Sequence, residues 1–149
     1  FDCLENLVNL DLSFNKVKTI FSYTFNCTNK LEDLSYSNNK IDSIEDNAFQ
    51  GLVSLKQLHL DNNRIKFINN KHFSSLKNLV KLNLAFNQLS KLESFSFKDL
   101  VKLDELKMND NCIFKMDSNL FKSLFYLKTL NLAYNLLRKV TRDHFKNLL

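Results

Sequence analysis

The chain has 149 residues, 44% of them hydrophobic and 25% charged, which is the composition of a folded soluble domain rather than of a disordered segment. No apolar run approaches the roughly 20 residues that cross a membrane, and no initiator Met, signal peptide or cationic targeting segment stands at the start. We therefore expect a mature piece or an excised fragment. Residues 1–74 carry 8 basic and 9 acidic side chains and residues 75–149 carry 13 and 7, so charges of −1 and +6 sum to the net +5. The basic second half permits an anionic partner without requiring one.

One period of 24 residues runs through the whole chain. Leu recurs at this spacing from Leu7 to Leu127, and half of the fourteen Phe residues recur at it from Phe1 to Phe145. An Asn column has the same period: Asn15, Asn39, Asn63, Asn87, Asn111 and Asn135. Pro is absent and Gly occurs only at Gly51, so Asn is expected to shape the turns, because it tolerates left-handed backbone and bonds to nearby main chain. Three registers with one period predict a repeat architecture.

Each 24-residue unit predicts one coil of a solenoid. Apolar and polar residues alternate at the start of each unit, which predicts short strands with one buried face at 9–13, 33–37, 57–61, 81–85, 105–109 and 129–133. The later apolar residues follow at irregular spacing, which favours an extended or single-turn return leg over a long helix. One coil cannot enclose its own Leu and Phe side chains, so it buries them against the next coil. Each stacked Asn amide is expected to supply donors and an acceptor to backbone groups where the strands end.

The pattern LxxLxLxxNxL followed by Phe resembles the typical class of animal extracellular leucine-rich repeats, and the resemblance covers the whole chain. Within that class, Phe1-Asp2-Cys3 and Phe25-Asn26-Cys27 look most like Toll-like receptor ectodomains, whereas variable lymphocyte receptors and small proteoglycans usually carry Pro in their return legs. The resemblance implies one leucine-rich repeat domain over residues 1–149, a solenoid of the α/β horseshoe class with about six repeats. A parallel sheet would line its concave side. Both ends fall within a unit and the Cys-rich caps of such ectodomains are missing, so flanking sequence is expected.

Cys3 and Cys27 occupy the same position on adjacent coils. Strands about 4.8 Å apart and disulfide Cα separations of roughly 4.4–6.8 Å make a bridge plausible, although coils spread further on the outer side. The alternative is two free, half-buried thiols in a cytosolic protein. The disulfide is favoured because the Toll-like resemblance implies an oxidising compartment. Cys112 has no partner in register, and a free thiol is favoured over a partner in missing sequence.

Asn26-Cys27-Thr28 is the one Asn-x-Ser/Thr glycosylation motif of the chain. A single motif could arise by chance among so many Asn residues. Thr28, however, interrupts a column that is otherwise Leu, from Leu4 to Leu148, so an apolar contact is given up there. We therefore favour glycosylation of Asn26, with which a disulfide at Cys27 could compete.

Lysines stack in short columns that suggest a polyanion-binding flank. The residues are Lys91, Lys115 and Lys139 in one column and Lys98, Lys122 and Lys146 in another. Like charges one coil apart repel unless an anion or an acidic neighbour compensates, so a phosphate-rich partner is one reading. None of these columns lies on the predicted strands, and solvated solenoid surface is the favoured reading.

The concave face offers the main candidate binding surface. Its ligand-binding candidates are Asn9, Asp11, Asp33, Gln57, His59, Asp61, Lys81, Asn83, Glu105, Lys107 and Asn131. Four acids against two lysines make this face polar and slightly acidic, which suits a protein better than a nucleic acid. Phe14, Phe86 and Tyr134 precede the Asn column and are either binding anchors or edge-packing residues, with edge packing favoured.

Catalysis, metal binding and cofactors find no support in the sequence. There is no Gly-rich phosphate loop, no Ser-His-Asp grouping that the repeat would bring together, and no isolated carboxylate pair in an apolar setting. The scattered His59, His72 and His144 do not predict a metal site, and solvated or core-edge histidines are favoured over a pH sensor. We expect no enzyme, but the ligand-binding part of a cell-surface or endosomal receptor with a protein ligand or co-receptor, and with receptor dimerisation possible. A matrix or adhesion protein is the alternative, and nucleic-acid binding along the lysine flank is a weaker one. Contact with a membrane would come only through the missing flanking sequence.

Overall fold

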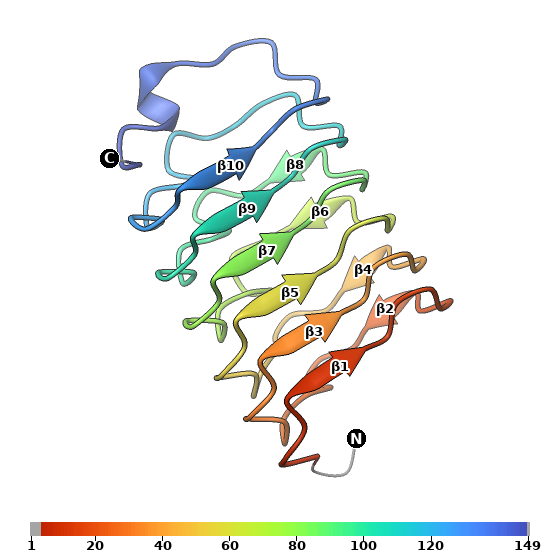
Figure 1. Cartoon of the computed structure of the whole chain (residues 1–149). Coiled ribbons are helices and arrows are strands. Elements are labelled where there is room, and N and C mark those ends of the chain that lie inside the picture. The colour runs from red at the N-terminus through yellow and green to blue at the C-terminus, as the bar shows by residue number, and fades with distance from the viewer. Residues whose placement is uncertain (1–3, 149) are drawn as a thin grey trace.

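The computed structural model describes residues 4–148 and shows a solenoid of stacked coils (Figure 1). One parallel sheet runs along it in the order β1-β3-β5-β7-β9-β10. Its strands are β1 (Asn9–Asp11), β3 (Asp33–Ser35), β5 (Gln57–His59), β7 (Lys81–Asn83), β9 (Glu105–Lys107) and β10 (Thr129–Asn131). Each residue pairs with the one 24 positions further on, as Leu10 does with Leu34 and Leu34 with Leu58. The leucine-rich repeat solenoid with 24-residue coils is therefore confirmed.

The strands are three residues long rather than the five that the alternation predicts. Hydrogen bonding nevertheless continues past their ends, since the Leu12 amide donates to the Ser35 carbonyl at 2.8 Å and the Phe14 amide to the Ser37 carbonyl at 3.0 Å. Regular pairing stops where the chain starts to turn at the Asn column.

The return legs are more regular than expected. They contain the two-residue strands β2 (Thr19–Ile20), β4 (Ser43–Ile44), β6 (Phe67–Ile68) and β8 (Lys91–Leu92), which pair as β2–β4 and β6–β8. A short 3-10 helix, η1 (Arg142–His144), lies in the last coil. Lys91 begins β8, a return-leg strand that was not predicted, and none of the six lysines lies on the six-stranded sheet, as expected. Two extended legs that run side by side can exchange backbone hydrogen bonds wherever they come close enough.

The Phe column forms the spine of the core. Phe25, Phe49, Phe73, Phe97 and Phe121 are at most 1% exposed, and successive rings from Phe25 to Phe145 lie 6.0–6.5 Å apart with interplanar angles of 3–15°. Equivalent rings of neighbouring coils are nearly parallel, so the distance between their centroids gives the spacing of the coils at the spine. This spacing is larger than the roughly 4.8 Å between neighbouring strands. The solenoid therefore curves, with the six-stranded sheet on its inner, concave side.

The Asn column ties each coil to its neighbours. Asn63 is 8% exposed; its Nδ2 donates to the carbonyls of Leu60 in its own coil and Tyr36 in the preceding one, and its Oδ1 accepts the Ile41 amide at 2.9 Å. Asn39, Asn87 and Asn111 repeat this arrangement. An amide has the donors and the acceptor that strand ends lack, so a single side chain satisfies buried backbone groups of two coils.

The residue before each Asn has left-handed backbone. These residues are Phe14, Asn38, Asn62, Phe86, Asp110 and Tyr134, with φ between 52° and 57°. Asn and Asp tolerate this conformation, but an aromatic residue rarely adopts it. Phe14 and Tyr134 are 82% exposed and Phe86 is 52% exposed. Phe86, which has described coils on both sides, is thus about half covered by its neighbours, and the rest of the ring faces solvent.

Candidate ligand-binding surfaces

The concave side of the six-stranded sheet, called here the sheet face, presents in-register rows of polar side chains. One row runs through Asp11, Ser35, His59, Asn83 and Lys107, and a second starts at Asn9, Asp33 and Gln57. All eleven candidate binding residues reach solvent, being exposed or half-buried: Asn9, Asp11, Asp33, Gln57, His59, Asp61, Lys81, Asn83, Glu105, Lys107 and Asn131. The register of the sheet thus gathers residues up to 122 positions apart (131 − 9) on one surface.

Hydrogen bonds across the strands hold part of this surface in place. The hydroxyls of Ser13 and Ser35 are 2.6 Å apart, and Ser35 donates to Ser37 at 3.3 Å. The Ser37 hydroxyl donates to Asp61 Oδ1 at 2.8 Å, which also accepts from Asn83 Nδ2 at 3.0 Å. A chain of side chains therefore links four coils. Side chains that are already ordered lose less conformational entropy when a partner binds.

The charges on the sheet face are distributed unevenly. Asp11, Asp33 and Asp61 lie on the first three coils, and His59 Nε2 is 3.9 Å from Asp33 Oδ1. On the later coils, Lys107 pairs with Glu105 at 2.6 Å. Hydrogen bonds from the side chain and amide of Ser13 hold the pKa of Asp11 below its ordinary value, so this carboxylate is charged at neutral pH. The acidic end and the mixed end favour different parts of a partner.

The repeat brings a serine, a histidine and an aspartate together, so the prediction that it forms no such grouping is wrong. Ser35, His59 and Asp33 line one hollow of about 390 Å³ on the sheet face. The Ser35 hydroxyl bonds to Ser13 and Ser37, however, and within residues 4–148 no hydrogen bond joins it to His59. His59 is therefore not positioned to activate this hydroxyl as a nucleophile.

The two lysine columns lie in different surroundings. Lys91, Lys115 and Lys139 border two adjoining hollows that share Phe114 and Lys115. Four cations line these hollows, counting Arg138, but so do three acids: Glu93, Asp117 and Asp143. In the other column, Lys122 lies over the Phe95 ring with its Nζ 5.8 Å from the centroid. The surplus of one positive charge in the hollows is weak support for a polyanion site.

A more apolar hollow lies beside the sheet, where the chain enters the strands. It measures about 640 Å³ and is lined by Val80, Val101, Lys102, Asp104, Phe125, Tyr126 and Lys128. Phe125 and Tyr126 are 65% and 69% exposed. The sequence analysis missed this hollow. A signal was present, because Tyr126 is an aromatic residue at a repeat position that is polar in other coils, where it is occupied by Asn6, Lys30 and Lys102.

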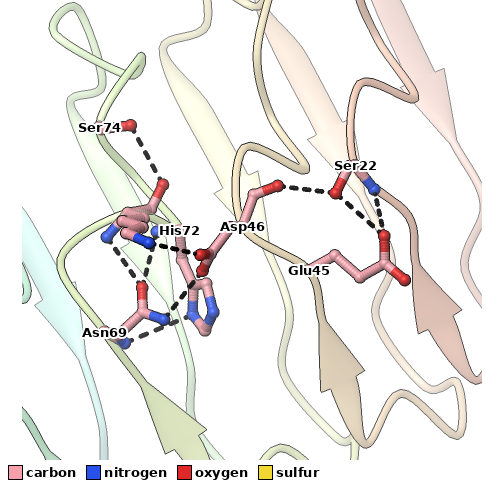
Figure 2. A network of polar contacts seen from close by, with 7 residues as sticks. Ser22, Glu45, Asp46, Asn69, His72 and Ser74 are labelled. Atoms are coloured by element: carbon pink, nitrogen blue, oxygen red, sulfur yellow. Dashed lines mark hydrogen bonds and ion pairs between the residues drawn. The ribbon is translucent and has the colours of Figure 1, made fainter.

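A polar network joins the return legs of the first three coils (Figure 2). Glu45 accepts the Ser22 amide and hydroxyl at 2.8 and 3.0 Å, and Asp46 accepts from Asn69 and Lys71 at 3.1 and 2.9 Å. These bonds hold the pKa of Asp46 below its ordinary value. The network braces the legs against one another and offers no open site.

His72 is a core histidine at the end of this network. It is 4% exposed, packs edge-on against Phe67 and Phe73, and its Nδ1 accepts the Asn69 amide at 3.4 Å. Burial lowers the pKa of His72 below 6.5, although the negative charges of Asp46 and Glu93 act in the other direction and raise it. His144, three coils further on, accepts the Thr141 amide in the same way at 3.1 Å. The shared position thus has a shared structural role.

Two of the three cysteines can be placed. Cys27 is half-buried on the return leg, and Cys112 is exposed next to the Asn column. Cys3 lies outside the described residues, so the Cys3–Cys27 disulfide stays a prediction. No helix within residues 4–148 is long and apolar enough to cross a bilayer.

The chain matches the family model for leucine rich repeats at residues 5–65 and 54–113, more than half of its length, and it belongs to the leucine-rich repeat family. Among solved structures it is similar to a TLR13–ssRNA13 complex, with 36% identity and a TM-score of 0.93 over 97% of this chain and 20% of that one. It is also similar to the Drosophila Toll–Spatzle complex, with 28% identity and a TM-score of 0.86 over 91% of this chain in the glycosylated form and 92% in a second structure. In each case the match covers only 20% of the receptor chain. No curated protein matches the chain. The resemblance to Toll-like ectodomains is confirmed.

Proposed function

We propose that the chain is the ligand-recognition part of a cell-surface or endosomal receptor of the Toll-like kind, and that its sheet face binds a protein. The observation that carries the proposal is the in-register polar surface, with its hydrogen-bonded chain from Ser13 to Asn83, on a frame whose core side chains are fully buried. Such a surface acts by binding alone, and signalling is left to other parts of the receptor. Fold by itself does not identify a ligand.

A protein partner is favoured over a nucleic acid by the charges. The sheet face carries four acids and two lysines, and phosphates are repelled by the acidic end formed by Asp11, Asp33 and Asp61. The similar structures include one complex with a protein, Spatzle, and one with single-stranded RNA, so both ligand classes occur among relatives. The hollow at Phe125 and Tyr126 is a second surface for the same partner or a co-receptor, because exposed aromatic residues often carry much of the binding energy at interfaces.

An adhesion or matrix protein is the alternative function. The receptor reading predicts a transmembrane span and a cytoplasmic signalling domain in the full-length sequence, whereas the adhesion reading does not. Sequencing the complete transcript separates the two.

The test of the binding surface compares Gln57→Arg and Asn9→Arg with the outer-surface variants Lys98→Glu, Lys122→Glu and Lys146→Glu. Spatzle serves as the protein probe and a single-stranded RNA as the nucleic-acid probe. We expect the sheet-face variants to weaken protein binding at least tenfold, with no change in the melting temperature, and the lysine variants to leave it unchanged. RNA binding that falls steeply with salt and disappears with the lysine charges would instead support the polyanion alternative.

A further inference from the structure

Thr28 is the exceptional member of a buried Leu column. The equivalent residues Leu52, Leu76, Leu100 and Leu124 are all 0% exposed, and Thr28 is 1% exposed. The backbone is the same in each coil, since the amide of each of these residues donates to the carbonyl of the Phe three positions earlier, at 3.1–3.3 Å. The position therefore accepts Leu without any change of conformation.

The Thr28 hydroxyl adds a single buried hydrogen bond, and it adds it to an oxygen that is already paired. Oγ1 donates to the Phe25 carbonyl at 3.0 Å, and that oxygen already accepts the Thr28 amide at 3.1 Å. Thr also buries less apolar surface than Leu, so it contributes less to the hydrophobic core. The reason for Thr at this position lies outside folding stability.

Asn26, two residues earlier, faces solvent. It is exposed, and its side chain forms no hydrogen bond to any other residue between 4 and 148. Its column continues through Gln50, Ser74, Lys98, Lys122 and Lys146; Ser74 is half-buried and the other four are exposed. A large group attached to Asn26 would extend into solvent from the return leg and would leave the sheet face open.

We infer that Asn26 carries an N-linked glycan and that Thr28 is present to direct its attachment. The inference rests on the extracellular or endosomal placement proposed above. In the transfer, Asn26 Nδ2 forms a bond to the anomeric carbon of a lipid-pyrophosphate-linked oligosaccharide. The bond from that carbon to the pyrophosphate oxygen breaks, the lipid pyrophosphate leaves with the electron pair, and Nδ2 loses a proton.

Attachment must precede the folding of this coil. Thr28 is 1% exposed, so a transferase cannot reach its hydroxyl in the folded chain. The next coil also packs directly on this segment: a Cβ added at Gly51 would lie 2.3 Å from the Phe25 carbonyl oxygen and 2.8 Å from the Asn26 Cα. The second coil therefore closes the glycosylation motif once it folds.

The experiment measures occupancy of Asn26 by peptide mass spectrometry, with and without glycosidase, on the chain secreted from a eukaryotic cell. Wild type and Thr28→Ser, which keeps the motif, are expected to be mostly occupied. Asn26→Gln, Thr28→Val and Thr28→Leu are expected to be unoccupied. Thr28→Leu should also raise the melting temperature of the deglycosylated protein by roughly 2–4 °C, whereas Asn26→Gln should leave it unchanged.

A secreted, folded wild-type chain with an empty Asn26 would overturn the inference and leave the proposed function standing. A chain that is retained or degraded while a secreted control receptor passes would contradict the extracellular placement and the inference with it. The timing is tested in vitro with purified transferase and its lipid-linked donor. The unfolded chain should be modified and the folded chain should not, and modification of both at equal rates would overturn the order proposed.

Discussion

The Phe spine and the turn column, which consists of the six residues that precede the Asn column, both contain aromatic residues at the same 24-residue period but in opposite environments. Phe73 is 1% exposed between Phe49 and Phe97, whereas Phe14 is 82% exposed with left-handed backbone. The period therefore determines where a side chain is placed in the coil, and the position within the period determines whether it stabilises the fold. Repeat positions whose side chains contribute little to stability are the ones that can vary to suit a binding partner.

The largest difference is expected between Phe73→Ala and Phe14→Ala. Removing a fully buried ring leaves a cavity in the spine and should lower the free energy of unfolding by about 3–5 kcal/mol. The exposed ring should contribute less than about 0.5 kcal/mol. Urea denaturation of both variants measures this, and equal losses would break the distinction between the two columns.

A smaller difference is expected along the Asn column itself. Asn63→Ala leaves the buried Ile41 amide without its acceptor and removes one of the two Asn donors to each of the Tyr36 and Leu60 carbonyls, which should cost about 1–3 kcal/mol. Asn15 is exposed and its Nδ2 bonds only to carbonyls of its own coil, Leu12 and Ser13, so Asn15→Ala should cost about 0.5–1 kcal/mol. Similar losses at both positions would contradict the view that the ladder works by linking coils.

The buried His72 should make stability depend on pH. Its folded-state pKa is below 6.5, so the unfolded chain binds the proton more readily. The stability from neutral His72 is complete above pH 6.5 and is lost as the pH falls through 6.5 toward the folded-state pKa. Protonated Nδ1 could not accept the Asn69 amide.

Unfolding by urea at neutral pH and near pH 5 should therefore show a loss in wild type that is reduced in His72→Gln. His144→Gln, in the half-exposed equivalent position, is the matched control and should keep the loss. An identical pH dependence of wild type and His72→Gln would show that other groups are responsible.

The smallest effect, and one of opposite sign, is expected at the turn. Phe86→Asn replaces an aromatic residue at φ 53° with one that tolerates this conformation, and should raise the free energy of unfolding by up to about 1 kcal/mol. If Phe86 contacts the partner, the same variant should bind it more weakly. A stabilised variant with unchanged binding would show that the Phe86 ring does not contribute to binding.

The period predicted the interior and missed much of the surface. A column of Leu, Asn or Phe at spacing 24 can be explained only by stacked equivalent coils, so the sheet, its register and the spine followed from the sequence. The paired strands β2–β4 and β6–β8 did not follow, because their pairing depends on how closely two return legs approach. The hollow at Phe125 and Tyr126 was also missed, since it forms only where apolar residues of three coils meet. The exposure of Phe14 and Tyr134 depends on turn geometry that residue type alone did not reveal.

The most direct test of the central claim places a glycan on the sheet face. Ala133→Thr creates a glycosylation motif at Asn131, and Asp11→Thr creates one at Asn9; both lie on the sheet face, where Asn131 is half-buried and Asn9 exposed. Lys139→Asn creates one at position 139, an exposed position off the six-stranded sheet and outside the hollow at Phe125 and Tyr126, as the control. With equal secretion and occupancy, ligand binding should be abolished by the glycans at Asn131 and Asn9 and retained with the glycan at position 139. Full binding with both sheet-face positions occupied would contradict the assignment of the sheet face as the ligand-binding surface.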